Sequence, residues 1–176
     1  DHQVVFSETI AYELAATVGL RVPAYGLCHV PWGDGIYFAS EKLGHRHSLE
    51  LLWPTEKIAN RELLSQVIVF DIWIANIDRN IGNLVYDSFV DGSETRLIIY
   101  AIDFEKSEVL RGDKDRFTIE ALPLENMWPR ETLGKLCNGL PVPYEFCTRI
   151  ESITEDEVAT AFGVWEDDLG LPRIEW

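Results

Sequence analysis

Two stretches of the sequence carry side chains whose types and spacing suit the transfer of a phosphoryl group. The first is the polar loop 76–83, in which Asn83 follows Asp78 at a distance of five residues. The second is the apolar run 98–102, which ends at Asp103. If the segment between the two stretches, which is rich in β-prone residues, forms a hairpin, Asn83 and Asp103 come close together.

The residue types match what phosphoryl transfer requires. The transferring phosphate is highly charged, and positioned metal ions must neutralise that charge. Mg²⁺ takes oxygen ligands, commonly one or two carboxylates together with phosphate oxygens. Asp103 offers a carboxylate, and Asn83 offers an amide oxygen without adding another negative charge. Asp78 would orient or deprotonate the acceptor hydroxyl, so we predict a catalytic role for Asp78 and a metal site at Asn83 and Asp103.

These residues also have a purely structural interpretation. Asp78, Asn80 and Asn83 could form Asx turns after a helix and do nothing else. Arg79 could contact a phosphate, or it could brace the loop by pairing with a carboxylate, which we favour. The decisive point for function is that an acidic residue ends the next apolar strand, because such groups cluster at reactive sites.

The elements expected before the loop are a helix, a hairpin and a second helix. Apolar residues recur at helical spacing over residues 4–18, and Gly19 offers a stop. Two β-prone runs, 25–30 and 36–40, are separated by turn residues and predict a hairpin. A nearly all-round apolar segment then runs to residue 74, with Asn60 as its N-cap, and predicts a buried helix.

The elements expected after the loop are a second hairpin and a mainly helical last third. Strands are predicted at 84–86 and 97–102, with a turn at Asp91-Gly92. Thr154 and Glu157 form a capping-box signature before another helix. The tryptophans of the last third, Trp128, Trp165 and Trp176, are expected to pack rather than to recognise a ligand.

Composition limits the classes of function. Hydrophobic residues make up 47% of the 176, so a sizeable core is possible, and 30 acidic against 15 basic residues give a net charge of −15. That charge argues against direct nucleic-acid binding and against an anionic membrane surface, and no apolar run approaches the ~18 residues of a membrane span.

Cysteine and histidine spacing give no sign of a disulfide framework or a metal centre. The three cysteines, Cys28, Cys137 and Cys147, are far apart, which predicts neither a disulfide framework nor a zinc site and favours a cytoplasmic location. His45 and His47 lack further ligands nearby and are expected to be surface residues.

The order and spacing of these motifs resemble the HipA-like kinase family, and more distantly the lipid kinases. The resemblance covers about residues 5–110. The resembling motifs before the polar loop are Ser7-Glu8 at the start of a helix, residues 19–23 after that helix, and residues 70–76. In and after the loop they are Asp78-Arg79 with Gly82-Asn83, and then Asp103-Phe104 after an apolar strand.

By this resemblance the chain is an ATP- and Mg²⁺-dependent phosphotransferase. Asp78 is implied to be the catalytic base, and Asn83 and Asp103 the metal ligands. Glu8 is implied to pair with a phosphate-binding lysine. The text Ser40-Glu41-Lys42-Leu43 is implied to be a hinge whose backbone holds adenine, with Glu41 and Leu43 as cofactor-binding residues. Without the resemblance, Glu8 could be an exposed first-turn acid, and the hinge an ordinary strand end.

The resemblance implies an α+β, protein-kinase-like fold over residues 1–176. Residues 1–44 would be an incomplete N-lobe with the hinge, and 45–176 a mainly α-helical C-lobe. Only seven residues precede Glu8, none is lysine, and no glycine-rich loop is present. Glu105 replaces the glycine of a mobile D-F-G switch. The missing strands could lie outside this sequence, be supplied by another chain, or be lost.

Three functions follow from these observations. The first is transfer of the ATP γ-phosphate to a hydroxyl of a protein Ser or Thr, or of a small molecule. The second is an inactive or split pseudokinase-like module that binds a protein partner, which the missing lysine favours. The third is a small-molecule phosphotransferase of the aminoglycoside kind, although such enzymes usually enter the catalytic loop with His-Gly-Asp, where this sequence reads Asn76-Ile77-Asp78.

Overall fold

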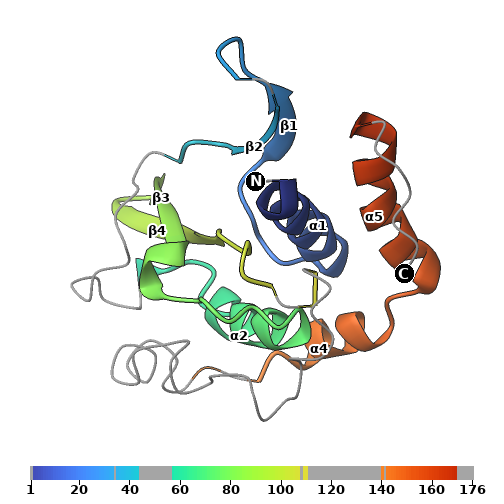
Figure 1. The fold of residues 1–176 in the computed structure, drawn as a ribbon. Helices are drawn as coiled ribbons and strands as arrows, with labels where there is room; N and C mark the ends of the chain where they lie inside the picture. The colour runs from blue at the N-terminus through green and yellow to red at the C-terminus, as the bar shows by residue number, and fades with distance from the viewer. Residues whose placement is uncertain are drawn as a thin grey trace.

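The computed structural model describes residues 2–33, 35–43, 57–107, 109–110, 140 and 142–169. The elements in these ranges are α1 His2–Val18, β1 Tyr25–His29, β2 Ile36–Ser40, α2 Leu63–Trp73, the short 3-10 helix η2 Ile81–Asn83, β3 Leu84–Asp91, β4 Glu94–Ala101, α4 Tyr144–Glu151 and α5 Glu155–Leu169. The described fold is therefore α+β, with two separate two-stranded antiparallel sheets. Figure 1 shows α1 in the middle, between α5 and the β3–β4 hairpin.

Helix α1 is the centre of the core. It was predicted over 4–18 and runs from His2 to Val18. Its end is a Schellman motif: Gly19 has φ +80°, the Leu20 N–H bonds the Ala15 C=O at 2.8 Å, and the Gly19 N–H bonds the Ala16 C=O at 3.1 Å. More than one face of α1 is buried, because β1, β2, α4 and α5 all contact it.

The hairpin β1–β2 confirms the first strand pair. Its antiparallel register runs from Tyr25 opposite Ser40 to His29 opposite Ile36. Phe38 and Tyr25 stack on each other and both meet the ring of Tyr12 of α1 edge-on, with ring centroids 4.8 and 5.0 Å from that of Tyr12. These contacts fix the base of the hairpin against α1, while its tip projects from the body (Figure 1).

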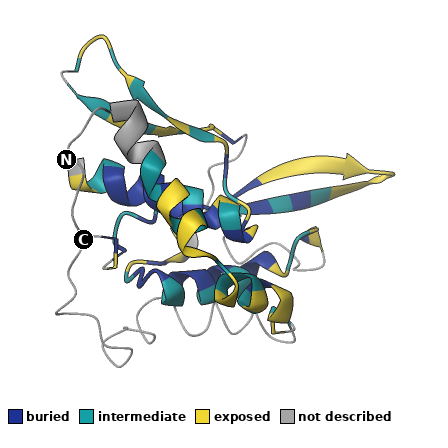
Figure 2. Cartoon of the chain, turned by 90° about the vertical axis from the view of Figure 1, so that its right-hand side faces the viewer, coloured by how far each residue is buried: buried dark blue, intermediate teal, exposed yellow. Residues whose placement is uncertain are grey.

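The hairpin β3–β4 is longer than its apolar text predicted. The strands reach Asp91 and Glu94, and the two-residue loop is Gly92-Ser93, where Gly92 has φ +63°. The first three residues of β3 are buried and the remaining five are exposed, so the outer half of the hairpin extends into solvent (Figure 2). The inner half alone packs against the core, which is why only that half carried a strong apolar signal.

The sequence predicted Asn60 as the N-cap of the next helix, but Asn60 does not cap it. Helix α2 has Glu62 at its N-cap, without a side-chain hydrogen bond. The Asn60 amide instead bonds the backbone of Ile99, donating to its C=O at 2.8 Å and accepting from its N–H at 2.9 Å. Asn60 thus extends the pairing of Ile58 with Leu97 along the edge of β4 and orients α2 relative to this hairpin.

Helix α2 is buried, as its apolar text predicted. Leu64, Val67 and Phe70 have no exposed surface. One core cluster joins apolar residues from Phe6 to Ala161, so described residues on both sides of the predicted lobe boundary at 44 share it.

The described end of the chain is helical, as expected, and the capping box is present. The Thr154 N–H donates to Glu157 Oε2 at 2.9 Å, and the Glu157 N–H donates to Thr154 Oγ1 at 3.2 Å. Trp128, Trp176, the Trp165 side chain, His45 and His47 lie outside what the structure describes, so the expectations for them are untested. Cys28 and Cys147 are free thiols. No helix in the described ranges has the length and apolarity that crossing a bilayer demands.

The capping box predicts an acid-sensitive start of α5. The hydrogen bond and ion pair with Arg149, followed by the bonds from Thr154, lower the pKa of Glu157 from 4.5 to about 2. Because the folded-state pKa is depressed, the contribution of Glu157 to stability is complete above pH 4.5 and is lost as pH falls through 2. We expect Glu157→Gln to reduce this acid dependence, measured by circular dichroism during acid titration. As a control, the acid titration of Glu145→Gln, which changes a residue of α4, should match that of the parent protein. If the titration curve of Glu157→Gln also matches that of the parent protein, Glu157 is not the source of the acid sensitivity.

Candidate functional site

The loop that carries Asp78 begins with a sharp reversal at the end of α2. Ala75 has φ +53°, and the Asn76 N–H bonds the Asp71 C=O at 2.8 Å. This is a helix-ending motif in which alanine takes the left-handed position usually given to glycine. After the reversal, residues 76–80 lead into η2, which continues directly into β3.

Asx turns do shape this loop: Asn80 forms one, as the structural interpretation expected, and Asn76 forms the other in place of Asp78 or Asn83. The Gly82 N–H donates to Asn80 Oδ1 at 2.9 Å, and the Asp78 N–H lies 3.4 Å from Asn76 Oδ1. A Cβ atom at Gly82 would lie 2.9 Å from Asn80 Oδ1, so glycine suits this position. Asp78 itself is exposed, and its carboxylate accepts no hydrogen bond from the described residues. Asp78 is thus available for chemistry, in contrast to the two asparagines.

Asn83 lies where the loop meets the strand that carries Asp103. Its Nδ2 donates to the Asp78 C=O at 3.2 Å, and its own C=O accepts from the Ile102 N–H at 3.0 Å. Leu84 pairs with Ala101 at the inner end of the hairpin. Asn83, which precedes Leu84, and Asp103, which comes soon after Ala101, therefore lie at this same end. The structure therefore brings Asp78, Asn83 and Asp103 to one region, from positions far apart in the sequence.

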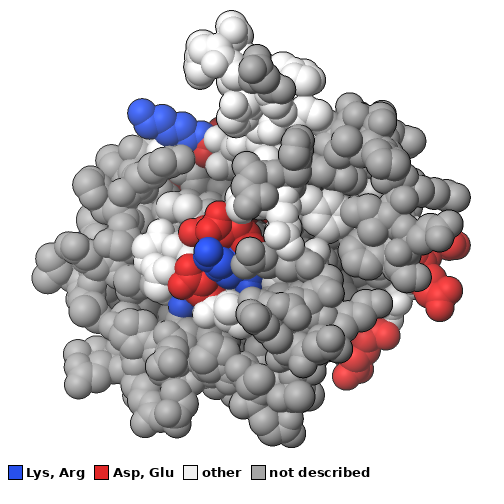
Figure 3. All heavy atoms as spheres, viewed as in Figure 1, with Lys and Arg blue, Asp and Glu red and all other residues white. Residues whose placement is uncertain are grey.

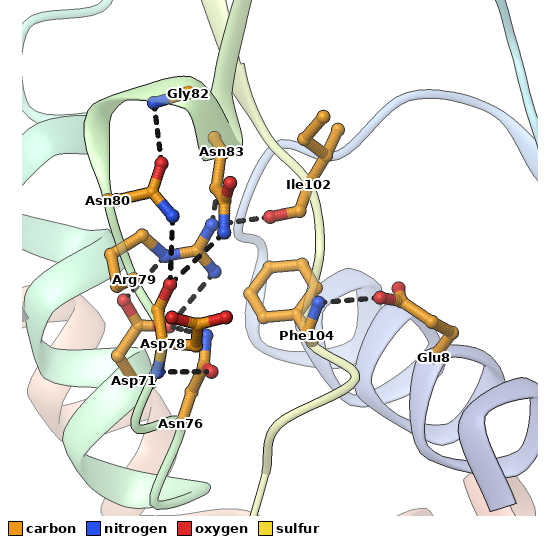
Figure 4. A network of polar contacts seen from close by, with 10 residues as sticks. All are labelled: Glu8, Asp71, Asn76, Asp78, Arg79, Asn80, Gly82, Asn83, Ile102 and Phe104. Atoms are coloured by element: carbon orange, nitrogen blue, oxygen red, sulfur yellow. Dashed lines mark hydrogen bonds and ion pairs between the residues drawn. The ribbon is translucent and has the colours of Figure 1, made fainter.

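The buried guanidinium of Arg79 holds this region together. Its Nε lies 2.8 Å from Asp71 Oδ2, and its Nη2 lies 3.0 Å from Asp71 Oδ1, so the pair is bidentate. Nη1 donates to two backbone C=O groups, that of Asn83 at 3.0 Å and that of Ile102. Both side chains of the pair are fully shielded from solvent. The bracing interpretation of Arg79 is therefore correct, and Figure 4 shows its position between the loop and the strand.

Asp71 is the buried partner of Arg79, and the sequence analysis did not single it out. The signal was a single acidic residue within the apolar helix text 63–74, because a buried carboxylate requires a partner. Burial raises the pKa of Asp71, while the charge and hydrogen bonds of Arg79 lower it. Asn76 Nδ2 supplies a further hydrogen bond to Asp71 Oδ1 at 2.9 Å.

Asp103 is half-buried and lies among other charges. Burial is the main reason that its pKa is raised, and the negative charge of Glu105 adds to this effect. Arg79 lowers the pKa and Asp78 raises it, to smaller extents. Figure 3 shows acidic side chains in the middle of one face of the molecule, with basic side chains beside them. A carboxylate disfavoured in its charged form by its surroundings is stabilised by binding a cation.

Glu8 is buried rather than exposed, which rules out the surface interpretation. Its side chain lies on α1, 8% exposed, and Oε1 accepts a hydrogen bond from the Phe104 N–H at 2.7 Å. Oε2 is also buried and has no hydrogen-bond partner among the described residues. Burial raises the pKa of Glu8 to about 7, against the opposing effect of the Phe104 hydrogen bond.

A pocket of about 530 Å³ adjoins these groups. Its lining comes from α1, β2 and the segment after β4, and consists of Val4, Val5, Glu8, Tyr12, Tyr37, Phe38, Ser40, Ile102, Asp103 and Glu105. The volume lies within the range of small-molecule sites, and the aromatic wall with a few polar groups is typical of them. Asp103 and Glu8 line this pocket, whereas Asp78 and Asn83 are not among its lining residues.

The predicted hinge is only partly at the pocket. Ser40 lines it, but Glu41 and Leu43 do not. The Glu41 N–H already donates to the Ala24 C=O at 2.6 Å, and its side chain is exposed. Leu43 is buried, 7% exposed. The Glu41 N–H is therefore engaged within the protein.

Replacing Glu8 by glutamine is expected to change the pH dependence of stability. Because the folded-state pKa of this acid is raised from 4.5 to about 7, stability is greatest below pH 4.5 and falls as pH rises to 7. Between pH 4.5 and pH 7 the free energy of unfolding should decrease by on the order of 3 kcal/mol, since each pKa unit corresponds to about 1.4 kcal/mol. Glu8→Gln should abolish most of this dependence in urea unfolding at several pH values, whereas Glu62→Gln should not. A parent protein equally stable at both pH values would contradict the shift.

The described residues contain no group of three or more His, Cys, Asp or Glu side chains arranged to hold a metal ion. The pair formed by Asn83 and Asp103 is a smaller set, with one amide and one carboxylate. Comparisons of the sequence and fold with protein families, with curated proteins and with solved structures found no match.

Proposed function

We propose that this chain has a kinase-like fold and is the catalytic body of a phosphotransferase resembling the HipA-like family. It transfers the ATP γ-phosphate to a hydroxyl of a protein Ser or Thr, or of a small molecule. The cytoplasm, which supplies ATP and Mg²⁺, is the proposed compartment. The observation that carries the proposal is the placement of Asp78, Asn83 and Asp103 in one region by the Asn83–Ile102 hydrogen bond and the Arg79 brace.

The donor set fits a hard divalent cation bound together with a nucleotide. Asn83 and Asp103 would hold Mg²⁺ through oxygen atoms, and phosphate oxygens would complete its coordination. Bound Mg²⁺ neutralises charge on the transferring phosphate. The pocket beside Asp103 has room for the nucleotide, with Tyr12 and Phe38 offering apolar surface for a base.

Asp78 is the proposed base because its carboxylate is exposed and plays no part in holding the loop. It accepts the proton of the acceptor hydroxyl while the hydroxyl oxygen bonds to the γ-phosphorus. The bond from that phosphorus to the bridging oxygen breaks, and ADP leaves. The loop backbone is held by Arg79 and Asn83, so the backbone position from which the Asp78 side chain extends is set in advance.

A second candidate is a split module completed by a protein partner. Its specific support is Glu8 Oε2, which is buried at the pocket without a hydrogen-bond partner in the described residues. A buried carboxylate oxygen of this kind is stabilised by a cation. A lysine side chain from a partner would supply it, and would also complete the phosphate contacts.

Calorimetry of ATP binding in the presence and absence of Mg²⁺ tests the proposal. We expect the parent protein to bind ATP more tightly with Mg²⁺, and Asp103→Asn to remove that Mg²⁺ dependence. Asp87→Asn is the matched control, because Asp87 is an exposed carboxylate on β3, outside the site. Binding that is equally strong without Mg²⁺, or unaffected by Asp103→Asn, would contradict the metal assignment. Binding that requires an added lysine-bearing partner would favour the split module.

A further inference from the structure

Asp103 has an uncommon backbone conformation at the point where the polypeptide leaves β4. Its φ is +63°, in the left-handed region. Residues with a Cβ atom rarely adopt this region, although Asp does so more readily than most. Such a conformation persists only where the surrounding structure enforces it.

The peptide groups on both sides of Asp103 are held by two buried ionisable side chains. On the preceding side, the Ile102 C=O accepts a hydrogen bond from Arg79 Nη1. On the following side, the Phe104 N–H donates to Glu8 Oε1 at 2.7 Å. Arg79 is 1% exposed and Glu8 is 8% exposed, so neither contact competes much with water. Figure 4 shows the two side chains reaching this segment from opposite sides.

The ring of Phe104 adds a third restraint. It is fully buried and meets the rings of Tyr12 and Phe70 edge-on, with centroids 5.5 and 5.4 Å away. The Arg79 guanidinium carbon lies 4.6 Å from the centroid of the same ring. The segment 102–104 is therefore fixed at the Ile102 carbonyl, the Phe104 amide and the Phe104 ring, and Asp103 in its middle lines the pocket.

We infer that Glu8 and Arg79 are positioning residues that hold Asp103 in its left-handed conformation and thereby direct its carboxylate into the pocket. The conformational part stands whether or not the protein transfers phosphate. The consequence for metal binding rests on the proposed function. Glu8 thus has a role within this chain that requires no lysine.

The conformational part is tested by comparing alanine with glycine at position 103. Neither residue is charged, so electrostatic effects cancel in the comparison. In the left-handed region the Cβ atom of alanine is disfavoured, and Asp103→Gly should show a folded-to-unfolded ratio about tenfold above that of Asp103→Ala. With Glu8→Leu added to both, residue 103 is free to relax, and the advantage of glycine should disappear or reverse. Urea unfolding of the four variants gives these ratios.

A tenfold advantage of glycine that persists with Glu8→Leu would overturn the role of Glu8. The corresponding test of Arg79 uses Arg79→Met together with Asp71→Leu, which removes both charges at once and avoids an unpaired buried carboxylate. If that double variant does not fold, the Glu8 comparison still decides. Adding Glu8→Gln instead of Glu8→Leu should preserve the glycine advantage, because glutamine keeps an oxygen that accepts the Phe104 N–H.

The metal-binding part is tested by the affinity for Mn²⁺·ATP. We expect Glu8→Leu to weaken it about tenfold, as loss of a supporting contact around a metal ligand typically does. Glu8→Gln should restore most of the affinity, which a general loss of stability would not explain. Equal affinity in the parent and Glu8→Leu would overturn this part. A parent protein that binds no Mn²⁺·ATP, but keeps the alanine–glycine difference, would defeat the proposed function and leave the conformational role intact.

Discussion

Replacing Asp78 with asparagine is expected to reduce phosphoryl transfer by about 100- to 10,000-fold, the usual contribution of a positioned general base. The affinity for Mg²⁺·ATP should stay within about twofold of the parent value, because Asp78 is not among the proposed metal ligands. Stability should also change little. The Asp78 side chain is exposed, and its contacts to Asn80 and Asn83 use its backbone C=O. Transfer of labelled γ-phosphate and calorimetry measure the two quantities on one preparation.

The matched control for this variant is Asp87→Asn, which makes the same chemical change on the exposed part of β3. Its turnover should equal that of the parent protein. If Asp78→Asn transfers phosphate as fast as Asp87→Asn, Asp78 is not the base. If Asp78→Asn instead loses nucleotide binding, the residue belongs to the metal site and not to the acceptor side.

Replacing Arg79 alone is expected to give the largest loss of stability in this protein. Arg79→Met leaves the fully buried Asp71 carboxylate without its bidentate partner, and two backbone C=O groups without the Arg79 donor. Breaking a buried ion pair in this way costs about 3–5 kcal/mol. Urea unfolding should therefore show a large decrease in the free energy of unfolding, or no folded protein at all.

Removing both charges should be much less harmful than removing one. Asp71→Leu combined with Arg79→Met takes away the pair without leaving an orphan carboxylate, and such replacements are often neutral in stability. A double-mutant cycle then gives the coupling energy directly. Additive effects of the two single variants would contradict the brace. Recovered stability with lost phosphoryl transfer would show that the ion pair serves to position the loop.

The sequence predicted the described helices and hairpins best where local chemistry decides. Gly19 ends α1 because glycine alone takes the left-handed position there without a penalty, and it does so in the structure. The pair Thr154 and Glu157 forms its reciprocal bonds within one turn, so residues far along the sequence do not matter. The order of loop, hairpin and acid also predicted that Asn83 and Asp103 would lie together.

What the sequence did not reveal depends on contacts between distant residues. Ala75 and Asp103 both have positive φ, but neither is glycine, so no local signal marks them. Asn60 resembles a helix cap in its local context, yet its amide bonds Ile99, 39 residues away. The backbone of the predicted hinge 40–43 was expected to hold adenine, but the Glu41 N–H donates to the Ala24 C=O just beyond the β1–β2 pairing. In each case tertiary packing overrides the local preference.

Paramagnetic broadening by Mn²⁺ bound with ATP tests the central claim most directly, because it reports which groups surround the cation. In the nuclear magnetic resonance spectrum of the labelled protein, we predict that the side-chain amide signals of Asn83 and the backbone N–H of Asp103 broaden beyond detection. The N–H of Gly92, at the far tip of the β3–β4 hairpin, should be unaffected. Bound Mn²⁺·ATP that leaves the Asn83 and Asp103 signals sharp would contradict the account.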